Sequence, residues 1–114
     1  MFDFEKLTVY TKAKDFNKVA TSICLDKTID SVTTNQLKRA ALSIPLNIAE
    51  GTSRFSNADK RNFYVIARGS AFECVAIFDI LKDNQKIDNE LFLDLYKSAE
   101  ELSMMLFAMI KKLS

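Results

Sequence analysis

The chain has 114 residues, of which 48% are hydrophobic and 27% charged, and its formal net charge is +1. This length fits one domain, residues 1–114, with a core of its own, and the near-zero net charge excludes an overall basic excess that would mark a nucleic-acid-binding protein. Two glycines and one proline are too few for the turns of a multi-stranded protein, so we expect long helices.

Cysteine usage and hydropathy indicate the compartment. Cys24 and Cys74 lie far apart and form no Cys-x-x-Cys motif. The N-terminal residues lack the pattern of a signal peptide, and the longest uncharged stretch, residues 40–49, is about half as long as a membrane-spanning helix. We therefore expect a cytoplasmic protein without membrane association, whose two thiols are reduced and buried.

The first predicted helix covers residues 4–25, where apolar residues recur at spacings of three and four. The polar stretch of residues 26–34, DKTIDSVTT, then interrupts this pattern. Its serine and threonine side chains are suited to cap the helix that follows.

The second predicted helix covers residues 34–50 and contains Pro45. Two apolar lines run along it: Leu37, Ala41, Ile44 and Ile48 form the first, and Leu42, Leu46 and Ala49 form the second. The first line keeps its phase across Pro45, which predicts one bent helix, and Gly51 is expected to end it with a positive φ. One line can face the core, so the second predicts a contact with another copy of the chain.

The third predicted helix begins after Ser56, whose hydroxyl is expected to cap it. Its predicted core seam is Phe63, Ala67, Ser70, Cys74, Ile77 and Leu81. Glycine inside a helix costs about 1 kcal/mol relative to alanine, so we expect another helix to approach closely at Gly69.

The fourth predicted helix begins after its N-cap residue, Asp88, and ends with Lys111 and Lys112, which complement the helix dipole. Like the others it carries apolar residues at helical spacing. Together the four segments predict an all-α protein, a single up-down-up-down four-helix bundle.

Charge is unevenly distributed along the chain. Residues 36–69 carry six basic and two acidic side chains, whereas residues 70–101 carry three basic and eight acidic ones. The candidate nucleic-acid-binding residues of the basic half are Lys38, Arg54, Lys60, Arg61 and Arg68. Two solvated helix faces of opposite sign that pack side by side would give the same distribution, so both interpretations stay open.

The residues for common catalytic chemistry are missing. The chain has no histidine, which excludes Ser-His-Asp and Cys-His nucleophiles and the histidine-containing di-iron sites of helix bundles. It has no glycine-rich phosphate loop. Glu50 and Glu73 lie in apolar segments, and we expect each to pair with an arginine such as Arg39 or Arg68 rather than to catalyse. We therefore expect no enzyme, no metal and no cofactor.

Residues 43–54, SIPLNIAEGTSR, and residues 67–73, ARGSAFE, resemble the signature of the four-helix-bundle family of bacterial 23S rRNA intervening-sequence proteins. The matching positions are Gln36, Arg39, Ala40, residues 43–51 with Pro45, Asn47, Glu50 and Gly51, then Arg54, Phe63, Tyr64, Ala67, Arg68, Gly69, Ser70 and Glu73. The chain departs from the usual pattern only at residues 52–53 and 71–72.

The resemblance implies a cytoplasmic bundle that assembles into a ring, a homopentamer, without established catalytic residues. It also implies two alternative roles. In the first, a non-enzymatic oligomer binds RNA or DNA through a basic surface. In the second, the ring is a scaffold for a protein partner, for example an accessory subunit of a reverse transcriptase, and nucleic-acid contact is secondary.

Overall fold

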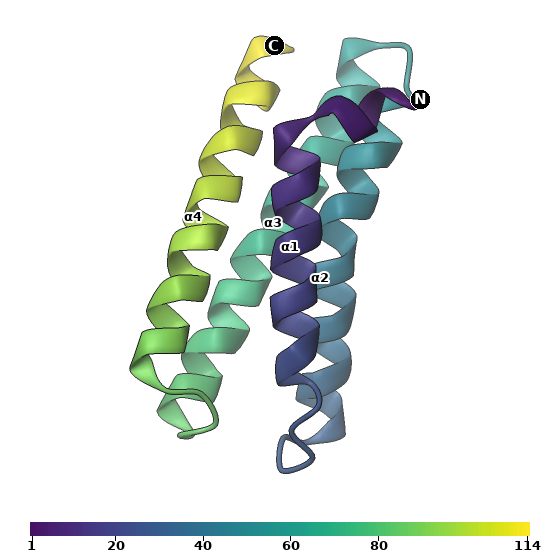
Figure 1. Cartoon of the computed structure of the whole chain (residues 1–114). Helices are drawn as coiled ribbons and strands as arrows, with labels where there is room; N and C mark the ends of the chain where they lie inside the picture. Colours follow the sequence, from purple (N-terminus) through teal and green to yellow (C-terminus); the bar gives the residue numbers. More distant parts are fainter.

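The computed structural model describes the whole chain, residues 1–114. A short 3₁₀ helix, η1 (Asp3–Lys6), precedes four α-helices: α1 (Thr8–Ile23), α2 (Ser31–Thr52), α3 (Asn57–Asp83) and α4 (Asn89–Lys112). Consecutive helices run in opposite directions, so both chain termini and the α2–α3 turn lie at the same end of the molecule (Figure 1). The predicted all-α four-helix bundle is confirmed.

The core is entirely apolar. A cluster of 24 buried residues from all four helices and their connections fills the interior, and no polar or charged residue is buried. Phe16 of α1 meets Phe78 of α3 edge to face, with ring centroids 5.9 Å apart. Each fully buried large apolar side chain contributes about 1.5–3 kcal/mol, so hydrophobic burial is what holds the four helices together.

The first two helices begin elsewhere than predicted. α1 begins at Thr8 because residues 3–6 form the separate helix η1. α2 begins at Ser31 because Asp30, and not a serine or threonine, is its N-cap: the carboxylate accepts a hydrogen bond from the backbone N–H of Thr33 at 2.9 Å. The predicted caps of the later helices are confirmed, since Ser56 and Asp88 each accept from the N–H three residues ahead.

Gly51 lies inside α2 and does not end it. The chain has no glycine with positive φ, and the C-cap residue is Ser53, whose hydroxyl donates to the carbonyl of Glu50 at 2.6 Å. The predicted glycine C-cap is therefore wrong. Packing is what requires glycine at this position, because a Cβ there would lie 2.5 Å from Cε1 of Tyr64, well inside van der Waals contact.

Gly69 has no close neighbour. A Cβ at this position would meet no heavy atom within 4 Å, so the helix approach predicted there does not occur within the chain. The predicted seam of α3 is confirmed at Ala67, Cys74, Ile77 and Leu81, and Tyr64, Ala71 and Phe78 are buried as well. Phe63 and Ser70 are only half-buried, because they lie at the edge of the core stripe and not at its centre.

The apolar lines of α2 occupy the predicted faces. The helix continues through Pro45, which is buried, and the first line lies in the core. In the second line Leu42 and Leu46 are 47% and 56% exposed, and no part of the chain covers them. The helix therefore presents an apolar ridge to its surroundings.

Candidate nucleic-acid interface

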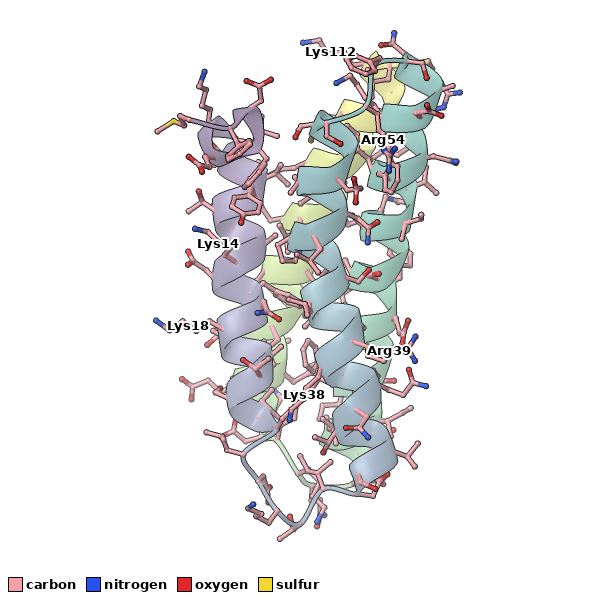
Figure 2. The ribbon with its side chains drawn as sticks, turned by 90° about the vertical axis from the view of Figure 1, so that its right-hand side faces the viewer. Lys14, Lys18, Lys38, Arg39, Arg54 and Lys112 are labelled. Atoms are coloured by element: carbon pink, nitrogen blue, oxygen red, sulfur yellow. The ribbon has the colours of Figure 1, made fainter.

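Basic side chains collect at the end of the bundle where the α2–α3 turn meets the last turn of α4. We call this group the basic end; its members are Arg54, Lys60, Arg61, Lys111 and Lys112. Nη1 of Arg61 donates to the carbonyl of Leu113 at 3.1 Å, which ties the start of α3 to the end of α4. Figure 2 shows Arg54 and Lys112 at this same end.

Arg54 is held by two exposed contacts. Its Nη2 lies 3.2 Å from Oε2 of Glu50, one turn earlier, and its guanidinium lies over the ring of Phe63, 4.6 Å from the centroid. The two charged side chains are 43% and 50% exposed, so the pair contributes no more than about 1 kcal/mol. The remaining guanidinium donors are free for another acceptor.

Lys60 and Arg61 cap helix C-termini. Nζ of Lys60 lies 3.2 Å from the carbonyl oxygen of Thr52, and Arg61 reaches the carbonyl of Leu113. These carbonyls lie at the C-terminal ends of α2 and α4, where the last carbonyl groups lack intrahelical partners and the helix dipole has its negative pole. Because both acceptors are neutral groups, neither contact cancels the positive charge that the side chain presents to solvent.

Arg68 lies away from this end. It is seven residues further along α3 than Arg61, about 10 Å, and its guanidinium lies between the rings of Phe72 and Phe107, 4.8 and 5.4 Å from their centroids. Its Nε is buried and has no hydrogen-bond partner. The packing between two rings marks Arg68 as part of the α3–α4 surface.

Lys38 is further away still. It precedes Arg54 by 16 residues along the chain, about 24 Å at the helical rise, and Figure 2 shows it toward the opposite end of the bundle. The structure therefore brings together three of the five predicted residues, Arg54, Lys60 and Arg61, and separates the other two from them.

Two members of the basic end, Lys111 and Lys112, were not among the predicted binding residues. Their position in the sequence indicates only that they complement the dipole of the last helix. The signal that could have found them is the topology, because an up-down-up-down order places the C-terminus of the fourth helix beside the turn between the second and third.

The signature residues line a polar groove of about 490 Å³ between α2 and α3. The side chains that line it include Gln36, Arg39, Leu42, Ser43, Leu46, Asn47, Ser70 and Glu73. The hydroxyl of Ser70 donates to Oγ of Ser43 at 2.8 Å, and Nδ2 of Asn47 donates to the carbonyl of Ser43 at 2.8 Å. This network joins the two helices beside the buried proline.

The predicted pairing of each glutamate with an arginine is confirmed for Glu50 and wrong for Glu73. Glu73 forms no ion pair, and Glu50 pairs with Arg54 rather than with Arg39 or Arg68. Both glutamates are exposed, so hydration stabilises their charge and no buried partner is needed.

The two thiols differ. Cys74 is fully buried, and desolvation, with a smaller effect from the charge of Glu73, raises its pKa to about 12. Cys24 is only half-buried, and burial raises its pKa as well. No group of three or more Cys, Asp or Glu side chains is placed to hold a metal ion, and none of the helices is long and apolar enough to cross a membrane.

Comparison with known proteins identifies the family. The family described as 23S rRNA-intervening sequence protein matches residues 5–108. The chain belongs to this family. No curated protein matches it.

A solved structure with the same fold is that of a protein of unknown function from the S23 ribosomal protein family of Bacteroides thetaiotaomicron. The TM-score is 0.84, the sequence identity is 24%, and the match covers 91% of this chain and 99% of that chain. At this identity the likeness establishes the fold of this 23S rRNA-intervening sequence protein, and says nothing about what it binds.

Proposed function

We propose that this 23S rRNA-intervening sequence protein is a non-enzymatic ring, a homopentamer, that binds RNA or another nucleic acid through its basic end. The observation that carries the proposal is the clustering of five cations from three helix ends, which outnumber the acidic side chains of that end: Glu50 in the last turns of α2, Asp59 in the first turn of α3, and Asp3 and Glu5 in η1. Phosphate backbones bind such a surface by releasing counterions.

Ring assembly strengthens this surface. If copies are related by an axis parallel to the helices, the basic ends of all subunits lie on one face of the ring. The opposite end carries the α1–α2 and α3–α4 connections, residues 24–30 and 84–88, which together hold two lysines and three aspartates, so the ring would be polar and would bind nucleic acid on one side. Binding would be weakly sequence-selective, because a ring of cations contacts phosphates rather than base edges.

The test is the salt dependence of binding. In the variant Lys60→Gln/Arg61→Gln/Lys112→Gln, we expect the slope of log affinity against log salt for a labelled single-stranded RNA to become shallower by up to about 2, at about 0.7 per lost phosphate contact. Fluorescence anisotropy over a series of salt concentrations measures it. A matched control, Lys14→Gln/Lys18→Gln/Lys27→Gln, removes the same charge from the helix α1 and its following turn.

Stability is monitored in parallel because two of the three residues also cap helices. Loss of the two capping contacts costs about 1–3 kcal/mol, which thermal unfolding reports separately from binding. A folded variant that binds RNA with the parental slope, or a control that loses as much as the test variant, refutes the basic end as the binding surface.

The alternative function is a scaffold for a protein partner, for example as an accessory subunit of a reverse transcriptase, with nucleic-acid contact secondary. The observation that favours it is an apolar groove of about 590 Å³ between α3 and α4, which has Asp79 and Glu100 among its lining residues. A ring that shows no salt-dependent RNA binding and whose groove stays accessible to solvent would support this alternative.

A further inference from the structure

The α3–α4 surface carries an unusual number of uncovered apolar side chains. Phe72, Tyr96, Met104 and Phe107 are between 43% and 68% exposed, and the first three line the apolar groove of about 590 Å³. Leu93 extends this surface along α4 and is 46% exposed. An exposed apolar groove flanked by charged residues is typical of a surface that another protein covers.

The same molecule presents a ridge that fits such a groove. On the outer side of α2 lie the exposed Leu42 and Leu46, with Val32 about three turns before them at 70% exposure. A charged residue stands at each end of the two leucines: Arg39 on the N-terminal side and Glu50 on the C-terminal side. We call this set the α2 ridge.

Charges on α4 follow the same spacing with the opposite order of sign. Glu100 and Lys111 are eleven residues apart, as are Arg39 and Glu50 on α2. Eleven residues make about three turns, so in both helices the two charges lie on one face. Between Glu100 and Lys111 stand Met104 and Phe107, at nearly the same intervals as the two leucines of the ridge.

Contacts within the bundle fix the relative heights of the helices. The Ser43–Ser70 hydrogen bond places these two residues of α2 and α3 at the same level along the bundle axis. The contact of Arg68 with the ring of Phe107 does the same for α3 and α4. With a rise of about 1.5 Å per residue, Arg39 lies about 6 Å below the level of Ser43, measured toward the end with the α1–α2 turn.

Arg68 and Phe107 lie about 3 Å above the Ser43 level, because Arg68 precedes Ser70 by two residues on a helix that runs downward. Glu100 precedes Phe107 by seven residues, so it lies about 7.5 Å below the Ser43 level, within about 2 Å of the height of Arg39. On the other side, Glu50 lies about 10.5 Å above the Ser43 level and Lys111 about 9 Å above it. The helices α2 and α4 also run in the same direction (Figure 1). Both charge pairs therefore match in height whenever two copies stand side by side without a shift along the helix axis.

We infer that the α2 ridge of one copy docks along α4 in the α3–α4 groove of a second copy. This inference rests on the ring of the proposed function, because a rotation axis parallel to the helices keeps all copies at one height. The contact pairs Arg39 with the second copy's Glu100, and Glu50 with its Lys111, which leaves Arg54, Lys60, Arg61 and Lys112 of the basic end for nucleic acid. It joins two different surfaces, so it is heterologous and repeats around a closed ring.

Glu50 keeps its role in the fold in this arrangement. Its pair with Arg54 is exposed and weak, and a carboxylate with two oxygens accepts from two cations at once. The buried Nε of Arg68 lies beside the same surface, and the open space around Gly69 leaves room for a close approach on the outer side of α3.

The first test separates a heterologous contact from a symmetric one. The ridge variant, Leu42→Glu/Leu46→Glu, and the groove variant, Met104→Glu/Phe107→Ser, change only exposed positions. We expect each variant alone to be monomeric and their equimolar mixture to form a 1:1 dimer, because one intact ridge then meets one intact groove. Light scattering coupled to size exclusion measures the masses.

The second test addresses the charges. Arg39→Glu and Glu100→Arg are each expected to raise the dissociation constant of the assembly at least about tenfold, and the double variant to recover most of this loss. Matched controls are Lys18→Glu on α1 and Asp94→Arg on the α1 side of α4, which lie outside the proposed contact. Circular dichroism verifies that every variant is helical.

The outcomes are distinct. A groove variant that still assembles alone, as a symmetric α2–α2 contact would allow, overturns the inference. A double charge variant as weak as the worse single variant also overturns it. In both cases an oligomeric wild type leaves the proposed ring standing, whereas a monomeric wild type refutes the ring and this contact together.

Discussion

Replacing each of the two glycines by alanine tests whether packing explains their positions. Gly51 and Gly69 both lie inside helices, so alanine gives each the same gain in helix propensity, about 0.8–1.0 kcal/mol. Their surroundings differ. A Cβ at residue 51 would lie 2.5 Å from Cε1 and 3.0 Å from Cδ1 of Tyr64, whereas a Cβ at residue 69 would meet nothing within 4 Å. The two substitutions should therefore have opposite effects.

The change in the free energy of unfolding for Gly51→Ala depends on how far the ring of Tyr64 must move. Tyr64 is only 5% exposed, and its ring can retreat only into the packed core, at a typical cost of about 1–3 kcal/mol for overpacking. Subtracting the propensity gain leaves a net destabilisation of about 0–2 kcal/mol. For Gly69→Ala no such cost applies, and we expect a stabilisation of about 0.5–1 kcal/mol.

Chemical denaturation at one fixed protein concentration measures both effects, since the midpoint of an oligomer depends on concentration. A double-mutant cycle with Tyr64→Leu identifies the cause: removing the ring edge should make Gly51→Ala less costly or even favourable. A Gly51→Ala variant that is stabilised as much as Gly69→Ala would refute the steric argument, and with it the requirement for glycine at residue 51.

Three further predictions concern assembly and the thiols. Leu42→Glu/Leu46→Glu should give helical monomers by light scattering; an oligomer of wild-type mass means that another face forms the ring. Pro45→Ala restores a backbone donor, so we expect equal or higher helical circular dichroism. We also expect a changed oligomer mass, because the proline determines the direction of α2 and so the position of the ridge. An unchanged mass contradicts this role. Cys74 has a pKa raised to about 12 and no exposed surface, so it should resist iodoacetamide at mildly alkaline pH in the folded protein, whereas Cys24 should react. Mass spectrometry distinguishes one adduct from two.

Sequence periodicity predicted the bundle well and the faces of its helices less well. Spacings of three and four residues located all four helices, and the caps Ser56 and Asp88 were correct. In α3 four of the six predicted seam residues are buried, but Phe63 and Ser70 were chosen where the following residues, Tyr64 and Ala71, are the buried ones. Only the depth of Tyr64 and Phe78 in the folded core shows how wide the buried stripe is.

The two glycines show why local rules were insufficient. The sequence suggested a helix end at Gly51 and a tight contact at Gly69, and both residues have the reverse environment. Nothing local distinguishes a glycine that ends a helix from one that admits a ring, since the ring of Tyr64 comes from the next helix. A tertiary contact of this kind is specified by the relative heights of helices, which no single segment determines.

The basic residues present the same difficulty for function. Counting charges marks Lys60 and Arg61 as cations, but it cannot tell a cation that caps a helix from one that binds phosphate. The structure shows that the two roles are compatible in this fold, because the acceptors are the neutral carbonyls of Thr52 and Leu113. A capping contact to a neutral group fixes the position of the charge without neutralising it, so the fold itself prearranges the cations. Loss of either side chain should thus lower stability and phosphate affinity together. A change in the slope of log affinity against log salt distinguishes the binding role, because capping alone does not produce it.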